Sequence, residues 1–243
     1  MRVPSTKVKN FFGKYLNKVI EGNEIIVTKN GKGVAKLTAY KDIVSCTIGE
    51  GAEDYFVNKR ITHEEFLTIS DNSDTRYELI NGSIYLLASP SHAHQIAIGE
   101  LYVQLYNYLD NKPCMVASSP YDVKLYNDAE CFEDDPNVVQ PDILVLCDKE
   151  NIINNRYEGI PTLVVEVLSP STKKKDLFIK LNLYFNSGIK EYWIADLENK
   201  NMILYSLDTE NITPVKTIKF GESFTSTYFK DLEIHTHKLL NLF

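Results

Sequence analysis

Apolar residues follow a helical spacing at the start of the chain and a strand-like spacing just after it. Residues 5–22 place hydrophobic side chains on one face of a helix: Val8, Phe11, Phe12, Tyr15, Leu16, Val19 and Ile20. Ser5 or Thr6 can cap this helix, and Gly22 can end it. The next segment, EIIVTKNGKGVAKLTAY, predicts two strands joined by Asn30-Gly31, because both residues tolerate the positive φ of a tight turn. A helix plus a hairpin is too small to bury a core alone, so we expect it to dimerise or to dock on the rest of the chain.

The rest of the chain alternates between strand and helix patterns. Residues 46–60 have weak periodicity and predict a linker with one short element. Three helices are predicted: one capped by Thr62 with Glu65 at the capping-box spacing, one over 89–111 with Ile96, Leu101, Leu105 and Leu109 near one stripe, and one over 174–188 ending at Gly188. Strand patterns cover 76–87, 114–126, 140–148, 162–169 and 191–208, the first with a turn at Asn81-Gly82. The pattern predicts an α/β or α+β sandwich over 61–243, preceded by a small module over 1–45.

Charge is distributed unevenly along the 243 residues, whose formal net charge is −7. Residues 1–40 hold eight Lys/Arg and two Asp/Glu, a balance of +6, so the other residues carry −13. A basic segment attached to an acidic body is an electrostatic footprint for nucleic acid. A solvated lysine-rich helix with no partner would have the same composition.

Composition also bears on the compartment. Hydrophobic residues make up 44% of the chain, enough for a core, but no apolar run approaches the roughly 20 residues that span a bilayer. The N-terminus, MRVPSTKVKN, lacks the apolar stretch of a signal peptide. The cysteines Cys46, Cys114, Cys131 and Cys147 show no CxxC spacing. Four thiols could form two disulfides, but without an export signal we expect a cytoplasmic protein with reduced thiols and no membrane association.

One predicted strand, TLVVEVLS, carries a carboxylate among apolar residues. Burying a charge is costly unless it is paired or binds a metal, so Glu166 either faces water at a strand edge or serves chemistry. Asp142 follows Pro141 at the start of another apolar strand, ILVLC. If the two strands are neighbours, these acids converge on an oxygen site suited to Mg²⁺, with Mn²⁺ as an alternative. A phosphodiester hydrolase needs such a site. The structural alternatives are a capped turn at Asp142 and an ion pair at Glu166.

A cation would complete such a site, and Lys180 is the candidate. In the predicted helix it lies about 100° from the centre of the apolar stripe, so its side chain either reaches back over the sheet or snorkels into solvent. Glu78, which interrupts YELI, and Gln95, near His92 and His94 at the start of the long helix, could also line the site. A helix N-terminus can bind phosphate. A strand-edge acid and ordinary helix capping and packing explain the same residues without chemistry.

The first 40 residues resemble the N-terminal DNA-binding half of Phd/YefM-type antitoxins. The matching features are the capped helix, the Gly-Asn-Glu turn, the strand IIVTKNGK and the return strand VAKL, in that order. The resemblance implies a homodimer that binds operator DNA, with Thr6, Lys7, Lys9 and Lys14 as the DNA-binding residues. Members of that family usually continue into a toxin-binding tail. This chain does not clearly do so, and a toxin partner is not indicated.

Residues from about 61 onward resemble the Uma-type restriction endonuclease family of the PD-(D/E)xK nuclease superfamily. The resemblance rests on RYELINGSI, SPSHAHQ, QPDILVL, PTLVVEVLSPST, DLFIKLNLY and GIKEYWIAD. It implies a restriction-endonuclease-like mixed central sheet flanked by helices, with Pro141-Asp142 as the PD pair and Glu166 as the second acid. The superfamily's lysine two residues after the Glu is Leu168 here. The resemblance implies Lys180 as its replacement, since the site uses the charge rather than its backbone position.

Together these features predict a magnesium-dependent endonuclease acting on DNA, joined to a DNA-binding module. The alternative is a non-catalytic DNA-binding regulator whose nuclease fold has lost activity or pairs with a toxin. RNA or branched DNA as the substrate is a third interpretation of the same features.

Overall fold

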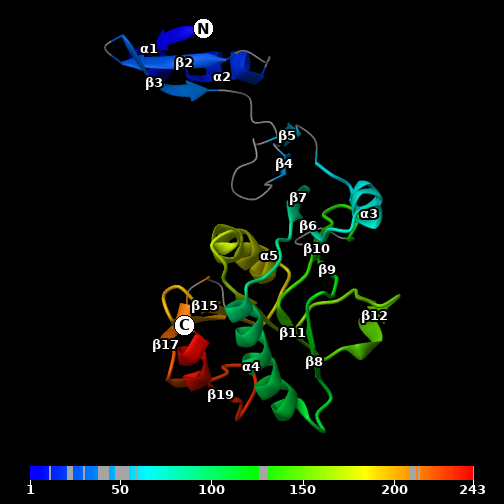
Figure 1. The fold of residues 1–243 in the computed structure, drawn as a ribbon. Coiled ribbons are helices and arrows are strands. Elements are labelled where there is room, and N and C mark those ends of the chain that lie inside the picture. The colour runs from blue at the N-terminus through cyan, green and yellow to red at the C-terminus, as the bar shows by residue number, and fades with distance from the viewer. Residues whose placement is uncertain are drawn as a thin grey trace. The chain divides into compact units, whose positions relative to one another are not determined.

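The computed structural model describes residues 1–10, 12–20, 24–29, 31–37, 44–46, 55–57, 60–125, 131–207, 212 and 214–242. The backbone forms two compact units, Met1–Ile43 and Val44–Phe243 (Figure 1). Among the helices of these residues, none is long and apolar enough to pass through a bilayer.

The smaller unit is a three-stranded sheet with two helices. Its elements are β1 (Arg2–Pro4), α1 (Ser5–Asn10), α2 (Phe12–Ile20), β2 (Ile25–Lys29) and β3 (Lys32–Leu37). β2 and β3 form the predicted antiparallel hairpin, with Gly31 at φ +79°, while β1 pairs in parallel with β2. Its core consists of Val3, Val8, Tyr15, Val19, Ile25 and Val27.

The sequence pattern did not predict β1, because a three-residue strand with one inward side chain shows no readable alternation. Phe12, expected on the apolar face of the helix, is 52% exposed within this unit. Phe11, Gly22 and Asn30, which the prediction also used, lie outside the described residues.

The larger unit contains all the other elements. Its helices are α3 (His63–Asp71), α4 (His92–Leu109), the 3-10 helix η1 (Lys149–Asn151), the π-helical segment η2 (Lys175–Lys180), α5 (Leu181–Asn186) and the 3-10 helix η3 (His237–Leu242). Its strands are β4 (Val44–Cys46), β5 (Tyr55–Val57), β6 (Tyr77–Ile80), β7 (Ser83–Leu86), β8 (Met115–Ser118), β9 (Val123–Leu125), β10 (Asn137–Val139), β11 (Ile143–Leu146), β12 (Ile152–Ile153), β13 (Arg156–Tyr157), β14 (Leu163–Val167), β15 (Glu191–Asp196), β16 (Asn201–Ser206), β17 (Pro214–Lys219), β18 (Ser223–Thr225) and β19 (Glu233–His235). The capping box at α3 is confirmed, since Glu65 N–H donates to Thr62 Oγ1 and Thr62 N–H donates to Glu65 Oε2. β5 lies within the predicted linker and pairs with β4, which ends where that linker begins.

A six-stranded mixed sheet lies at the centre of the larger unit, in the order β17-β16-β15-β14-β11-β8. β14 and β15 are parallel, and the other neighbours are antiparallel. α4 covers one face, where Leu101 shares a core cluster with Ile143 and Val165. α5 covers the other face, where Leu181 clusters with Val164. The predicted restriction-endonuclease-like sheet flanked by helices is confirmed (Figure 1).

A second sheet, in the order β12-β13-β9-β10-β6-β7, packs on the α5 side. Ile80 of β6 and Val139 of β10 belong to the same core cluster as Leu144 and Val164 of the central sheet. β6 and β7 form the predicted hairpin, with Asn81 and Gly82 both at positive φ. The inward-pointing side chains of β6 therefore face the side of β14 from which the even-numbered residues of β14 project.

Two predictions about side chains in the larger unit are wrong. Ile96 is 39% exposed. It lies about 140° around the helix from Leu101, which is buried against the sheet. Cys114 and Cys147 form a disulfide rather than remaining reduced. Leu146 pairs with Met115 between β11 and β8, and Cys147 and Cys114 lie one residue beyond that pair. Their separation in sequence does not reveal this proximity.

Candidate active site

Asp142 and Glu166 lie opposite each other on neighbouring strands. β11 and β14 are antiparallel with Ile143 paired to Val165, so extending this register by one residue places Asp142 opposite Glu166. Directly opposite residues project from the same face of a sheet. Both side chains line a cavity of about 640 Å³. The structure thus brings together the two acids that the sequence pattern predicts to converge, while their roles stay predictions.

Glu166 is buried but paired. It is 3% exposed, and Lys180 Nζ lies 2.7 Å from its Oε1. The Tyr184 hydroxyl donates to the same oxygen at 2.9 Å. A water-facing position at a strand edge is therefore excluded for this carboxylate. Within the described part of the chain, its hydrogen bonds and its ion pair all involve Oε1, so Oε2 remains for a ligand in the cavity.

Lys180 connects three carboxylates and is only 2% exposed. Its Nζ lies 2.7 Å from Glu78 Oε1, 2.7 Å from Glu166 Oε1 and 3.9 Å from Asp176 Oδ1. An α-helical phase would put Lys180 at the border of the apolar stripe. Residues Lys175–Lys180 instead form a π-helical segment, whose wider turn changes that phase. The side chain points inward, and the interpretation of Lys180 as a snorkelling surface lysine is wrong.

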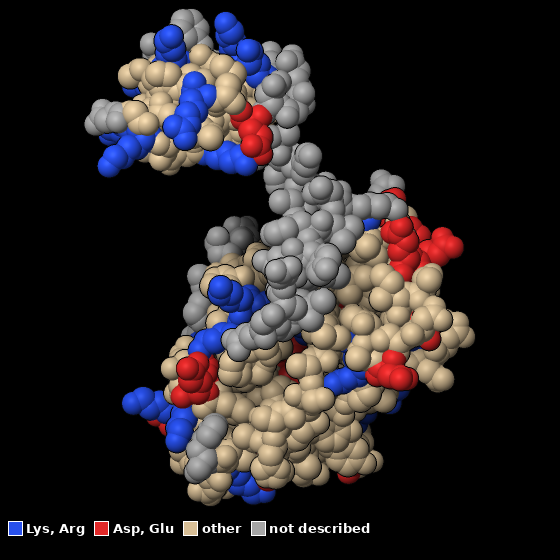
Figure 2. Space-filling model, turned by 45° about the horizontal axis from the view of Figure 1, so that its top comes forward, with Lys and Arg blue, Asp and Glu red and all other residues tan. Residues whose placement is uncertain are grey.

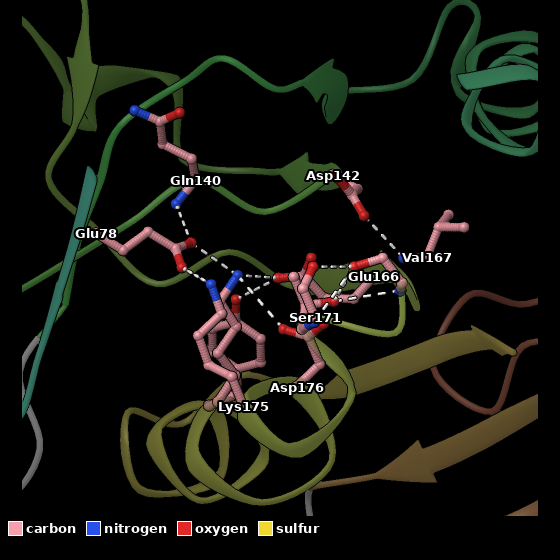
Figure 3. A network of polar contacts seen from close by, with 12 residues as sticks. Glu78, Gln140, Asp142, Glu166, Val167, Ser171, Lys175 and Asp176 are labelled. Carbon is pink, nitrogen blue, oxygen red and sulfur yellow. Dashed lines mark hydrogen bonds and ion pairs between the residues drawn. The ribbon is translucent and has the colours of Figure 1, made fainter. Parts of the chain in front are cut away.

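Glu78 reaches the same cluster from the second sheet. It is fully buried, and it accepts a 2.5 Å hydrogen bond from Lys175 Nζ on Oε2. The backbone N–H of Gln140 donates to its Oε1 at 2.9 Å. Figure 3 shows Glu78 and Lys175 pointing toward each other across the space between the strands and the helix. Glu78 is therefore not a strand-edge acid, and it holds both lysines of the cluster.

Asp142 is fixed by two neighbours. Its Oδ2 accepts a hydrogen bond of 2.8 Å from the Val167 N–H and lies 3.3 Å from His94 Nε2 (Figure 3 shows the Val167 contact). Ser91 caps α4 by accepting from the His94 N–H, which holds His94 in the first turn of the helix. The Nδ1 of His94 is buried and has no hydrogen-bond partner among the described residues. His94 thus packs against Asp142, a contact that the capping interpretation alone did not predict.

The cluster has more buried carboxylates than ammonium groups. Glu78, Glu166 and Asp176 face Lys175 and Lys180, so full ionisation would leave an excess of negative charge. Burial raises the pKa of Glu166 to about 8, with Lys180 opposing the rise and the neighbouring carboxylates adding to it. Burial likewise raises the pKa of Asp176, against the effect of the two lysines. Burial acts to raise the pKa of Glu78 as well, but the two lysines outweigh it and hold that pKa at about 2.

The pKa values of Lys180 and His94 are both raised in this environment. Burial opposes the charge of Lys180, but Glu166, Glu78 and Asp176 together raise its pKa well above the ordinary value. Burial also acts to lower the pKa of His94, and its contact with Asp142 outweighs this, so the pKa of His94 is raised. The excess of carboxylates over cations thus raises the pKa of Glu166 and of Asp176, both of which line the cavity.

The donor set suits a hard divalent cation. Mg²⁺ is usually held by one or two carboxylates together with waters and phosphate oxygens. Asp142 and Glu166 each present an oxygen toward the cavity, and the raised pKa of Glu166 indicates that added positive charge there would be stabilised. The described residues contain no group of three or more His, Cys, Asp and Glu side chains that could hold a metal ion. The arrangement therefore fits Mg²⁺ or Mn²⁺ and not a zinc site built from protein ligands alone.

Some of the other residues predicted to take part in catalysis or DNA binding line the cavity, and others lie in the smaller unit. Gln95 is exposed and lines the cavity, whereas His92 does not. Thr6, Lys7, Lys9 and Lys14 are exposed on the helices of the smaller unit. Sequence analysis did not single out Tyr184, Asp176 or the contact between Lys175 and Glu78. Tyr184 is four residues after Lys180, so a search for polar groups on the same helix face could have found it.

The larger unit thus combines a mixed sheet, an Asp and a Glu on neighbouring strands, and a lysine from the next helix that contacts the Glu. These features are those of a nuclease-like domain. The chain belongs to the Uma2 family, described as "Putative restriction endonuclease", whose model matches residues 63–237. It is 28% identical over 147 residues to "Uncharacterized protein slr1290" of Synechocystis sp., covering 60% of this chain and 74% of that protein. Its fold is similar to that of "a putative nuclease belonging to DUF820" from Anabaena variabilis, with a TM-score of 0.58, 16% identity, and coverage of 75% of this chain and 98% of that one.

Proposed function

We propose that the protein is a metal-dependent endonuclease that hydrolyses phosphodiester bonds in DNA. The observation that carries this proposal is the placement of Asp142 opposite Glu166 on the wall of one cavity, with Lys180 in contact with Glu166. Membership of a family described as "Putative restriction endonuclease" supports the nuclease reaction. The two carboxylates support the metal dependence, because the site has negative charge in excess of its lysines.

Each residue of the site has a distinct part in this reaction. Asp142 and Glu166 would hold the Mg²⁺, which when bound supplies Lewis-acid chemistry and a water of lowered pKa. Lys180, positioned by Glu78, stabilises negative charge on the phosphate or orients the attacking water. His94 and the Val167 N–H keep Asp142 in place. Gln95, on the same cavity wall, contacts the nucleic acid or a water.

We further propose that the smaller unit supplies the attraction for DNA and pairs with a second copy. Residues 1–40 carry a balance of +6, whereas the rest of the chain carries −13 and repels a polyanion. Lys7, Lys9 and Lys14 are exposed, as is Thr6, and Figure 2 shows lysine and arginine side chains spread over the visible face of this unit. Counterion release by such lysines gives binding that is independent of sequence and sensitive to salt.

One observation favours a second candidate function. Lys180 and Tyr184 already occupy Glu166 Oε1, and Lys175 and Lys180 together occupy Glu78. A cluster closed by its own ion pairs would also serve a nuclease fold that binds DNA without cutting it. Cleavage activity separates the two candidates.

The test is nicking of supercoiled plasmid DNA with Mg²⁺ or Mn²⁺, compared with EDTA. Asp142→Asn removes one proposed ligand at nearly constant volume, and Asp148→Asn is a matched control at an exposed acid six positions along the chain. We expect the wild type and Asp148→Asn to nick only with metal, and Asp142→Asn to have lost activity. Calorimetric titration with Mn²⁺ should show weaker binding to Asp142→Asn alone. Metal-independent nicking, or equal activity in the two variants, would refute the proposed site, and RNA in place of DNA tests the substrate class.

A further inference from the structure

Four lysine and arginine side chains line the cavity, and three of them are neutralised by acids. They are Arg76, Lys173, Lys175 and Lys180. Lys175 and Lys180 are tied to Glu78, and Lys180 also to Glu166. Lys173 Nζ lies 2.7 Å from Glu198 Oε2 and 3.5 Å from Asp196 Oδ2. Arg76 differs from all three: its guanidinium makes no ion pair or hydrogen bond with the residues that the structure describes.

The backbone holds Arg76 at a defined point of the cavity wall. It directly precedes β6, and its carbonyl accepts a 2.9 Å hydrogen bond from the Leu87 N–H, which closes the open end of the β6–β7 hairpin. From Leu87 the chain continues along the cavity wall to Ser91, the N-cap of α4. The position is therefore fixed by the sheet on one side and by the start of α4 on the other. Only the side chain, which is half-buried, lacks an anchor.

We infer that Arg76 binds a phosphodiester group of the nucleic-acid substrate in this cavity, an inference that rests on the proposed function. An arginine presents a planar fork of donors that matches two oxygens of one phosphate. The other cavity lysines are compensated, so they add little attraction for a polyanion approaching a body with a charge of −13. An uncompensated guanidinium that lines the same cavity as Asp142 and Glu166 can orient the substrate backbone beside the reacting group.

The inference is tested by the salt dependence of binding of the full-length protein to a short fluorescein-labelled DNA duplex, measured by anisotropy in Ca²⁺. Arg76→Gln removes both the charge and the planar fork of guanidinium donors, whereas Arg76→Lys keeps the charge but not the fork. Arg60→Gln is the control, because it removes the same charge from an arginine that is paired with Asp135 and lies outside the cavity. We expect Arg76→Gln to bind about tenfold more weakly and its log–log salt slope to fall by about 0.9, the loss of one phosphate contact. Arg76→Lys should keep the slope and lose less affinity, and Arg60→Gln should match the wild type.

Equal slopes for Arg76→Gln and Arg60→Gln would overturn the inference, because they would show that no phosphate lies at Arg76. A lower melting temperature for Arg76→Gln would also overturn it, since it would reveal a structural partner for the guanidinium. If the wild type bound no nucleic acid, both the inference and the proposed function would fall. If the slope fell as expected but no variant or wild type cut DNA, the phosphate site would stand and the endonuclease proposal would fail.

Discussion

Replacement of Glu166 by Gln separates a metal ligand from a structural ion-pair partner. The change removes the ionisable group at nearly constant volume. The amide oxygen can still accept from Tyr184 and Lys180, the two groups now bound to Oε1. Lys180 is not left unpaired, because Glu78 lies 2.7 Å and Asp176 3.9 Å from its Nζ. The structure therefore gives no reason for the variant to unfold.

The magnitude follows from the pKa of Glu166, which burial raises from 4.5 to about 8. In the metal-free protein at pH 7, the folded chain keeps a proton that the unfolded chain has released, at a cost of about 3 kcal/mol. Between pH 4.5 and about 8 the unfolded state binds fewer protons, so the stability of the wild type falls as pH rises through that window. Glu166→Gln lacks this contribution, and at pH 7 without metal it should be the more stable protein by up to about 3 kcal/mol.

The assay is chemical denaturation from pH 5 to 8, with EDTA and with Mg²⁺, alongside plasmid nicking. Mg²⁺ should stabilise the wild type and not Glu166→Gln, because a ligand that binds only the folded state stabilises it. Glu150→Gln, at an exposed acid, is the matched control and should follow the wild type throughout. The pKa of Asp176 is also raised, so Asp176 contributes to the pH dependence of stability in both the wild type and Glu166→Gln. The difference in stability between these two proteins, rather than the pH dependence of either one, therefore isolates the contribution of Glu166. A variant that lost roughly 3–5 kcal/mol, as breaking a buried pair does, and still cut DNA would refute the two-carboxylate mechanism.

Three further predictions concern the rest of the molecule. Lys180→Ala should leave Mn²⁺ binding measurable by calorimetry while turnover falls. It should lower the free energy of unfolding in denaturant by about 3–5 kcal/mol, because it leaves Glu78 and Glu166 without their shared cation. Full activity of this variant would argue against the role of Lys180. Deleting residues 1–40 should weaken duplex binding and flatten its salt dependence in anisotropy titrations, since it removes a balance of +6; unchanged binding would exclude a DNA-binding role for the segment. The full chain should be a homodimer at micromolar concentration by light scattering, and a monomeric mass would contradict the pairing.

Much of the fold could be predicted because local signals agreed with the tertiary structure. The capping box of Thr62 and Glu65, the turn at Asn81-Gly82 and the apolar strand around Glu166 each have a local physical cause, and each is found in place. Ile96 was assigned to the wrong face because apolar residues surround α4 on several sides, so hydrophobicity alone did not define one stripe. The disulfide between Cys114 and Cys147 could not be predicted, since it depends on which strands are neighbours.

The candidate site was predictable only as far as strand order could be guessed. Glu166 stood out because a carboxylate within an apolar strand demands a partner. Its partner Lys180 was harder to place, because the α-helical phase put it at a border and only the π-helical segment Lys175–Lys180 turns it inward. That segment also brings Lys175 onto Glu78. A local change of helical pitch, which no periodicity analysis at 3.6 residues per turn detects, thus supplies both buried cations of the cluster. Leu168 stands where the resemblance leads one to expect a lysine, and the structure instead brings Lys180 of the next helix to within 2.7 Å of Glu166 Oε1.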